Sequence, residues 1–301
     1  MNSLPRFSII TPTLNRASMI NSAVESVLIN NYPNVEHIIV DGGSTDGTLD
    51  VLAHYHHLKI LSSPDRGMYD ALNKGLQLVT GEIIGFLNSD DLYAPQAFHQ
   101  VALAFRNGNT LAVAGEAIVF SKTADGGKNI LNRFNPGDAS LLELSTLGSP
   151  FMNAWFFRKL VFGKIGNFNS AYRIAADRDF MLRLALSGTQ YTILNTLVYQ
   201  YLHHADSKTF DITDQKFERI VKEHLRMTSS YLKLKNLSKP ARGLIRQFRT
   251  RDTIEMSIRS MKLMQFFKCA NYIFEGLRCD WRWPIQFGSY FFHALNTKIS
   301  C

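Results

Sequence analysis

Short apolar runs alternate with amphipathic stretches along the first part of the chain. The apolar runs predict strands near 7–11, 36–41, 58–61, 82–87 and 111–115. Between these runs, apolar residues at helical spacing predict helices near 17–30, 48–56, 69–79 and 95–107. Because strands that alternate with helices form βαβ units, the pattern predicts an α/β fold with a Rossmann-like, mostly parallel central sheet flanked by helices.

The pattern changes in the second half of the chain. Residues 116–175 contain many Gly, Asn and Asp turns, and we expect strands and loops there. Residues 177–187 predict a short amphipathic helix, and two strand-like runs, YTIL and LVYQYL, follow it. From Thr213 the apolar spacing is helical to the end of the chain. The sequence therefore predicts an α/β domain over 1–208 and an α-helical appendage over 209–301.

Polar residues end four of the predicted strands. In an open α/β sheet, ligands bind outside the carboxyl ends of the strands, so these turns mark the expected binding crevice. The acidic residues at these strand ends are Asp41, Asp65, Asp90 and Asp91. Clustered carboxylates are hard oxygen ligands that suit Mn²⁺ or Mg²⁺, and such an ion neutralises a diphosphate. A structural interpretation stays open for each residue, because an Asp in a turn can also cap the following helix.

Two common nucleotide-binding fingerprints are missing from the chain. No GxGxxG follows the first predicted strand, and no GxxxxGK[ST] occurs anywhere, which argues against a dehydrogenase or a P-loop kinase. The run HYHH at 54–57 has the composition of a metal site, but it spans a predicted helix end and a loop. We interpret it as solvent-exposed surface.

The positive charge lies at the end of the chain. Residues 1–200 carry 15 Lys and Arg against 16 Asp and Glu, which gives −1, whereas residues 201–301 carry 18 against 9, which gives +9. The aromatic residues near Arg278 and Arg282 are Trp281, Trp283, Phe287, Tyr290, Phe291 and Phe292. Aromatic and cationic residues on helices are typical of an anionic membrane interface. A solvated helical face is the alternative, and we expect no nucleic-acid partner because no recognised module is present.

Cysteine spacing and hydropathy bear on the compartment. The cysteines Cys269, Cys279 and Cys301 form no CxxC pair, which predicts neither a zinc knuckle nor a disulfide framework. No signal-peptide pattern precedes the first predicted strand, and no run of about 18 apolar residues predicts a membrane-spanning helix. These features predict a cytoplasmic protein, peripheral at the inner face of the plasma membrane.

Five segments occur in order along the chain: FSIITPTLNR, IIVDGGSTDGT, DRGMYDALNKG, FLNSDD and AADRDFMLRLALSG. They resemble family 2 glycosyltransferases over roughly residues 6–205. The resemblance implies the GT-A fold and an inverting reaction that uses a nucleotide-diphosphate sugar as donor. It also implies a nucleotide-sugar-binding half at 1–115 and an acceptor-side half at 116–208.

The resemblance implies roles for single residues. The residues expected to contact the nucleotide sugar are Thr11, Pro12, Asp41, Asp65, Arg66, Asn73 and Asp90. Asp91 would bind the Mn²⁺ or Mg²⁺ ion that bridges the diphosphate, and His204, with His203 as the alternative, would lie near that ion. Asp177 would be the catalytic base, because a carboxylate opposite the leaving group accepts the proton of the acceptor hydroxyl. One base on the far face implies a single displacement and hence inversion.

Two positions depart from the usual family pattern. The acidic motif usually begins with Asp, whereas this chain has Asn88. The base region often reads Glu-Asp, whereas here Asp177 and Asp179 are separated by Arg178. We prefer Asp177 as the base because it lies at the predicted start of the helix, and Asp179 lies roughly 200° further around it.

These features predict an enzyme that transfers a sugar to a hydroxyl of a saccharide or polyprenyl-linked acceptor, in bacterial surface polysaccharide biosynthesis. A nucleotidyltransferase is one alternative, but TPTLNR is not the Gly-rich phosphate loop of that class. A non-catalytic nucleotide-binding or scaffold relative is another. Asn88 favours it, whereas Asp90, Asp91 and Asp177 argue against it.

Overall fold

The computed structural model describes residues 4–123, 125–137, 139–204 and 213–288. The chain divides into two compact units, one of Met1–Leu144 with Ser149–Phe210 and one of Ser145–Gly148 with Asp211–Cys301. We call them the sheet unit and the helical unit.

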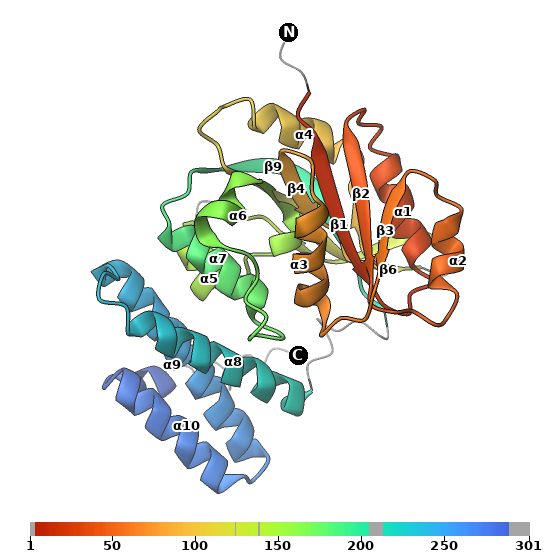
Figure 1. The fold of residues 1–301 in the computed structure, drawn as a ribbon. Coiled ribbons are helices and arrows are strands. Elements are labelled where there is room, and N and C mark those ends of the chain that lie inside the picture. The colour runs from red at the N-terminus through yellow and green to blue at the C-terminus, as the bar shows by residue number, and fades with distance from the viewer. Residues whose placement is uncertain (1–3, 124, 138, 205–212, 289–301) are drawn as a thin grey trace. The chain divides into compact units, whose positions relative to one another are not determined.

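The sheet unit contains a nine-stranded sheet (Figure 1). Its strands are β1 (Phe7–Thr13), β2 (Val35–Asp41), β3 (Leu58–Ser62), β4 (Ile83–Phe86), β5 (Leu92–Tyr93), β6 (Ala112–Lys122), β7 (Lys128–Phe134), β8 (Trp155–Arg158) and β9 (Tyr191–Leu202). They lie in the order β3-β2-β1-β4-β8-β6-β9-β5, with β7 on β6. Pairing is parallel from β3 to β4 and between β6 and β9, and antiparallel elsewhere. The α/β fold is thus confirmed, and its sheet is mixed because β5, β7 and β8 run against their neighbours.

Side chains alternate between the two faces along the first strands, so the two faces of the sheet pack against different helices. The helices are α1 (Ile20–Leu28), α2 (Thr48–Ala53), α3 (Met68–Leu78), α4 (Ala97–Ala104), α5 (Leu141–Thr146), α6 (Leu160–Ile165) and α7 (Ala176–Leu186). Ile39 packs with residues of α1 and α2. On the other face, a Cβ at Gly75 of α3 would lie 2.5 Å from Ile10, so only glycine permits this close approach. Phe86 continues that face toward Phe162 of α6.

The register places the carboxyl ends of the first strands side by side. Thr13 of β1 pairs with Asp41 of β2, and Asp41 pairs with Ser62 of β3. On the other side of β1, the backbone N–H of Leu87 donates to the carbonyl of Ile10 at 3.0 Å. The loops after these four strands therefore start from one edge of the sheet, as the polar strand ends predicted.

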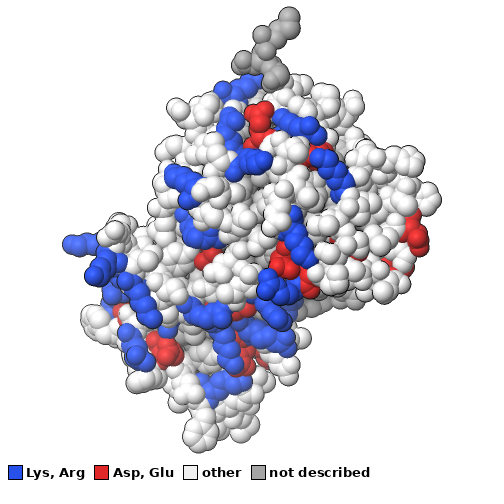
Figure 2. All heavy atoms as spheres, in the orientation of Figure 1, with Lys and Arg blue, Asp and Glu red and all other residues white. Residues whose placement is uncertain are grey.

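The helical unit contains α8 (Asp214–Leu232), α9 (Lys239–Lys262) and α10 (Phe266–Cys279), which confirms the helical appendage. Side chains of Thr213 and Ser238 cap α8 and α9. Val221, Met256 and Tyr272, one from each helix, form the centre of a small core. Lys and Arg side chains are spread over its visible surface, with Asp and Glu among them (Figure 2). Within the described residues, no helix has the length and apolar character needed to span a bilayer.

Candidate active site

Asp41 lies at the end of β2 and is buried. Its carboxylate accepts hydrogen bonds from the Ser62 hydroxyl at 2.7 Å, from the Gly43 N–H at 3.1 Å, and from both the N–H and the hydroxyl of Ser44. Burial alone would raise the pKa of Asp41, but these donors, led by Ser44 and Ser62, bring the pKa below its ordinary value. The Asp41 carboxylate therefore orders the turn that follows β2.

Asp65 lies against the same turn. Its Oδ1 accepts from the Gly67 N–H at 2.8 Å, and a Cβ at Gly42 would lie 2.5 Å from its Oδ2. The glycine at position 42 is thus what lets the Asp65 carboxylate approach the backbone. Arg66 is exposed and forms an ion pair with Asp70 at 3.0 Å, one turn into α3.

Thr11 and Pro12 lie within β1 and are buried. The Thr11 hydroxyl is 2.9 Å from Nε2 of His37, which is also buried. Burial, and then the nearby His57, lower the pKa of His37 to about 3, so this imidazole is neutral in the folded protein at pH 7. The Thr11 side chain thus points into the sheet unit, toward His37.

Asn73 joins α3 to the segment before α7. Its amide donates to the Phe168 carbonyl at 2.9 Å and accepts from the Phe168 N–H at 3.0 Å. Both polar ends of the side chain are therefore bonded to one backbone position. Asn73 positions the residues that lead to Asp177.

Asp90 and Asp91 lie in the loop between β4 and β5. Residues 92–93 form β5, which pairs with β9, and α4 begins only at Ala97. The doublet does not cap α4, so the capping interpretation is not supported. The sequence pattern had placed residues 95–107 in one helix, and Pro95 lies before its observed start.

The Asp91 carboxylate is 2% exposed and faces three donors. These are the Asn88 amide and the Tyr199 hydroxyl, each at 2.9 Å, and the Leu202 N–H at 3.0 Å. Burial and then the Asp90 carboxylate raise the pKa of Asp91 to about 8, although the three donors act in the opposite direction. An Asp at position 88 would place a further negative charge against the buried Asp91 carboxylate, whereas Asn88 donates a hydrogen bond to it.

Asp90 faces away from that network. Its Oδ2 is 3.1 Å from Nε2 of His204, and both side chains are partly exposed. The backbone N–H of His203 instead donates to the Phe120 carbonyl at 2.7 Å. The His204 ring therefore meets the acidic doublet.

Asp177 lies in the first turn of α7, where its Oδ1 accepts from the Arg178 N–H at 2.7 Å. Burial, then the charge of Asp177 and a hydrogen bond to it, raise the pKa of Tyr69 well above its ordinary value. Asp179 is buried and forms an ion pair with Arg183 at 2.9 Å. Of the two acids of α7, Asp177 is therefore the one next to the tyrosine of DRGMYDALNKG.

Tyr201 connects the base region to the acidic doublet. Burial first, and then the charges of Asp91, Asp177 and Asp90, raise the pKa of its phenol well above the ordinary value. One side chain is thus within electrostatic range of all three carboxylates. The sequence reasoning missed Tyr69, Tyr199 and Tyr201, although the alternation in LVYQYL puts the last two on one face of a strand.

The Asp90–His204 pair fits a divalent cation. Neighbouring ligands of an octahedral ion lie about 3 Å apart when each is about 2.1 Å from it, which matches the 3.1 Å between these two atoms. Among the described residues, no three His, Cys, Asp or Glu side chains are placed so that they could hold a metal ion together, so phosphate and water oxygens would complete the shell. His54, His56 and His57 are exposed, in agreement with the surface interpretation.

Comparison with known proteins shows to which family the chain belongs. Residues 8–174 match the family model described as glycosyl transferase family 2. A PGL/p-HBAD biosynthesis glycosyltransferase of Mycobacterium tuberculosis is 36% identical over 187 residues, which cover 60% of this chain and 69% of that protein. An uncharacterized glycosyltransferase of Nostoc sp. is 26% identical over 67% of this chain and 66% of its own length.

Solved structures show the same fold. S. aureus TarS 1–349 in complex with UDP-GlcNAc has a TM-score of 0.68 at 18% identity, over 91% of this chain and 81% of that one. The mannosyltransferase PcManGT from Pyrobaculum calidifontis, in complex with GDP-Man and Mn²⁺, has a TM-score of 0.58 at 16% identity, over 96% and 87%. These neighbours confirm the GT-A fold, and the family match makes the nucleotidyltransferase alternative unnecessary. The chain belongs to glycosyl transferase family 2 and is a glycosyltransferase.

Proposed function

We propose that the enzyme moves a sugar from a nucleotide-diphosphate donor to an acceptor hydroxyl by a metal-assisted, inverting single displacement. The observation that carries the proposal is the convergence of Asp90, His204 and Asp177 on the surroundings of Tyr201. A cation-binding pair and a separate carboxylate are the two groups that such a displacement needs.

We assign metal binding to Asp90 and not to Asp91, the residue expected from the sequence. Asp91 is buried, and its two oxygens accept three hydrogen bonds from the protein, so we assign it the positioning of the β9 end that leads to His204. Asp90 and His204 would hold Mn²⁺ or Mg²⁺. When bound, the ion offsets the negative charge of the leaving diphosphate.

The nucleotide would lie along the ends of β1, β2 and β3. Asp65 and Arg66, at the rim of this edge, are the side chains we propose for direct contact, together with Asp90 at the ribose or sugar. Asp41, Thr11 and Asn73 would act indirectly, because their polar atoms bond to Ser62 and Ser44, to His37 and to Phe168. Pro12 would shape the floor beneath the base.

Asp177 would be the catalytic base. Its carboxylate is partly exposed, whereas that of Asp179 is buried against Arg183. A hydroxyl held at Asp177 loses its proton to the carboxylate as the bond to the sugar carbon forms and the bond to the diphosphate breaks. Attack from the side opposite the leaving group inverts the anomeric configuration.

The acceptor and the compartment belong to the same proposal. We propose a saccharide or polyprenyl-linked acceptor of bacterial surface polysaccharide assembly, and a cytoplasmic enzyme that contacts the anionic inner face of the membrane through its helical unit. Phe267, Phe274 and Trp281 are 93%, 60% and 78% exposed, and the Arg278 guanidinium lies over the Phe274 ring, 5.7 Å from its centre. Such a face suits a lipid headgroup region.

Not every aromatic residue named from the sequence belongs to that face. Trp283 is 4% exposed, and its indole N–H donates to the Thr253 hydroxyl at 3.0 Å. Phe287 stacks on Trp283 with ring centres 5.0 Å apart. These two residues pack within the helical unit, and 290–292 lie outside the described residues.

Donor binding and turnover test the proposal together. UDP- and GDP-sugars are screened by thermal shift with Mn²⁺, because a ligand that binds only the folded state raises the melting temperature. We expect one sugar nucleotide to raise it only when Mn²⁺ is present, and slow donor hydrolysis to follow the same nucleotide. No Mn²⁺-dependent shift and no hydrolysis with any donor would overturn the assignment.

A further inference from the structure

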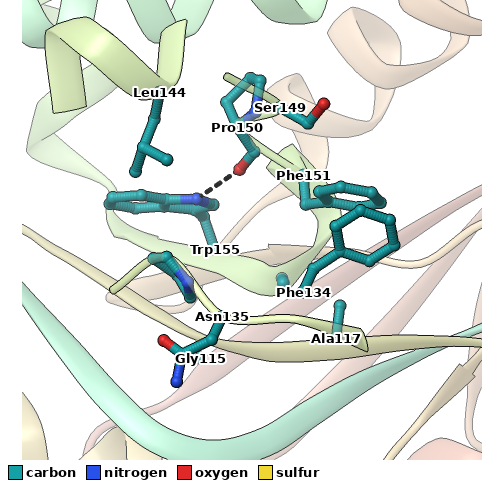
Figure 3. A pocket seen from close by; sticks show the side chains of 11 residues that line it. Gly115, Ala117, Phe134, Asn135, Leu144, Ser149, Pro150, Phe151 and Trp155 are labelled. Atoms are coloured by element: carbon teal, nitrogen blue, oxygen red, sulfur yellow. Dashed lines mark hydrogen bonds between the residues drawn. The ribbon is translucent and has the colours of Figure 1, made fainter. Parts of the chain in front are cut away.

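A pocket of about 240 Å³ lies in the acceptor-side half of the sheet unit. Its walls come from β6, β7 and the segment from α5 to β8, and include Ala117, Phe134, Leu144, Pro150, Phe151 and Trp155. The rings of Phe134 and Phe151 lie together on one side, with centres 3.7 Å apart, and the Trp155 indole forms another wall (Figure 3).

Two polar side chains of this pocket, Trp155 and Asn135, are already engaged within the protein. The Trp155 indole N–H donates to the Pro150 carbonyl at 2.7 Å (Figure 3). The Asn135 amide donates to Glu116 at 3.0 Å and accepts from the Gly137 N–H at 2.8 Å. A sugar ring placed here would lose hydration of its hydroxyls with few partners in return, which costs free energy. An apolar group meets no such cost.

The pocket lies behind aromatic residues that border the acidic doublet. Phe151 contacts Tyr201 edge to face, with ring centres 5.7 Å apart. The Tyr201 ring centre is 5.0 Å from that of Tyr199, whose hydroxyl donates to Asp91 at 2.9 Å. Asn153, two residues after Phe151, donates to the Tyr199 hydroxyl at 3.1 Å. A group in the pocket is thus separated from the carboxylates by the Phe151 and Tyr201 rings.

The backbone at Phe151 supports a binding role for this wall. Its φ of +40° lies in the left-handed region, where a residue with a Cβ is strained by about 1–3 kcal/mol. Strain of this kind persists where the surrounding structure enforces it, and it concentrates at ligand sites. Here the strained turn holds the Phe151 ring between Phe134 and Tyr201.

We propose that this pocket binds an apolar group of the acceptor, on the other side of the Phe151 and Tyr201 rings from the carboxylates. The inference rests on the proposed function. An apolar cavity of about 150 Å³ accommodates benzene, so a pocket of about 240 Å³ holds one aromatic ring or a short isoprenoid segment. The group comes either from an aromatic aglycone or from the first isoprene units of a lipid carrier.

Ligand-observed NMR and calorimetry on the full chain test the pocket without turnover. The probes are phenyl β-D-glucopyranoside, methyl β-D-glucopyranoside and citronellyl phosphate. We expect the phenyl glucoside to bind about tenfold more tightly than the methyl glucoside, with saturation transferred mainly to its aryl protons. Displacement of it by citronellyl phosphate assigns the pocket to a lipid carrier, and no displacement assigns it to an aromatic aglycone.

Three variants locate the binding. Phe151→Gly removes the ring and relieves the positive φ, so it is expected to stay folded. Leu144→Phe fills the pocket from a partly exposed position. Each should weaken phenyl glucoside binding by about tenfold. Leu131→Phe, an exposed site on β7 outside the pocket, is the matched control and should leave binding unchanged.

The proposal is overturned if the phenyl and methyl glucosides bind equally, if neither binds, or if the pocket variants bind as the control does. Mn²⁺-dependent binding of the donor is measured in the same samples. A retained donor response with no aryl preference removes the pocket proposal alone. Loss of the donor response with the aryl preference intact removes the proposed function instead.

Discussion

The ends of β2 and β4 carry acidic residues in similar places, but the two regions use them differently. At the end of β2, Ser62, Ser44 and Gly43 surround Asp41 with donors and bring its pKa below the ordinary value. After β4, burial and Asp90 raise the pKa of Asp91 to about 8. The first region stabilises the charge of its carboxylate, whereas the second disfavours the charge of its buried carboxylate, Asp91.

This difference separates structural from functional acids. A carboxylate with a complete set of donors gains little from a cation, whereas two adjacent carboxylates beside His204 gain much from one. The Asp90–His204 pair and Asp177 are therefore where loss of a charge should affect catalysis most. Asp41 is where it should affect folding most.

The largest expected effect is on the base. Asp177→Asn should lower kcat by about 10²–10⁴-fold, because the amide cannot accept the proton of the acceptor hydroxyl. Donor affinity, measured by thermal shift with Mn²⁺, should stay near that of the wild type. Unchanged kcat in this variant, or an equal loss of donor binding, would remove Asp177 from the reaction.

The next effect separates the two residues of the doublet. Loss of an outer-shell partner weakens metal binding by about 10- to 100-fold, and we expect Asp91→Asn to fall in this range. Asp90→Asn should weaken Mn²⁺-dependent donor binding by more, because it removes a direct ligand. The measurement is a Mn²⁺ titration of the donor-induced thermal shift. A larger loss in Asp91→Asn than in Asp90→Asn would return the metal role to Asp91.

The sequence was most informative where local pattern and packing agree. Predicted strands near 7–11, 36–41 and 58–61 match β1, β2 and β3, because apolar runs bounded by turns are strand signals. β1 and β2 lie inside the sheet, and β3 lies at its edge. The two runs YTIL and LVYQYL form the single strand β9. The strand β5 has only two residues, which is too short to show an alternation of apolar and polar positions in the sequence. It is defined by its pairing with β9.

For the site, the sequence indicated which acids lie near the crevice but not which ones the protein uses internally. Asp90 and Asp91 are adjacent, yet one faces His204 and the other faces Asn88, Tyr199 and Leu202. Tyr199, Leu202 and His204 come from segments more than a hundred positions away, and no local pattern encodes them. The burial of Trp283 likewise depends on tertiary contacts, with Thr253 and with the close approach of Gly276.

For folding stability the order of the two regions should be reversed, so that losing Asp41 costs more than losing Asp90. Asp41→Ala leaves the donors from Ser62, Ser44 and Gly43 without their acceptor, and a buried donor without a partner costs about 1–3 kcal/mol. We expect a lower free energy of unfolding in urea by about that amount or more. Asp90→Ala, at a partly exposed site, should change it by less than about 0.5 kcal/mol. Equal losses in the two variants would contradict the comparison.

The smallest effect is a pH dependence of stability that His37 contributes in the first region. The pKa of His37 is lowered from 6.5 to about 3, so above pH 6.5 it is neutral in both the folded and the unfolded chain. As the pH falls below 6.5, the unfolded chain takes up a proton that the folded protein does not, and stability is lost by up to about 1.4 kcal/mol per pH unit. The raised pKa of Asp91 has the opposite effect, because it makes the folded protein more stable as the pH falls through this range. The measurement therefore compares the pH dependence of stability between the wild type and a His37 variant.

Urea unfolding of wild type and His37→Gln at pH 6.5, 5.75 and 5.0 measures this difference. Gln keeps a polar group for the Thr11 hydroxyl but does not titrate, so the variant should lose less stability than the wild type as the pH falls. His56→Gln, at an exposed position and not among the groups that shift the pKa of His37, is the matched control and should follow the wild type closely. If the free energy of unfolding changes with pH equally in wild type and His37→Gln, His37 titrates alike in the folded and unfolded chain. The region around β2 would then hold its polar groups less tightly than the contacts of Asp41 and Thr11 indicate.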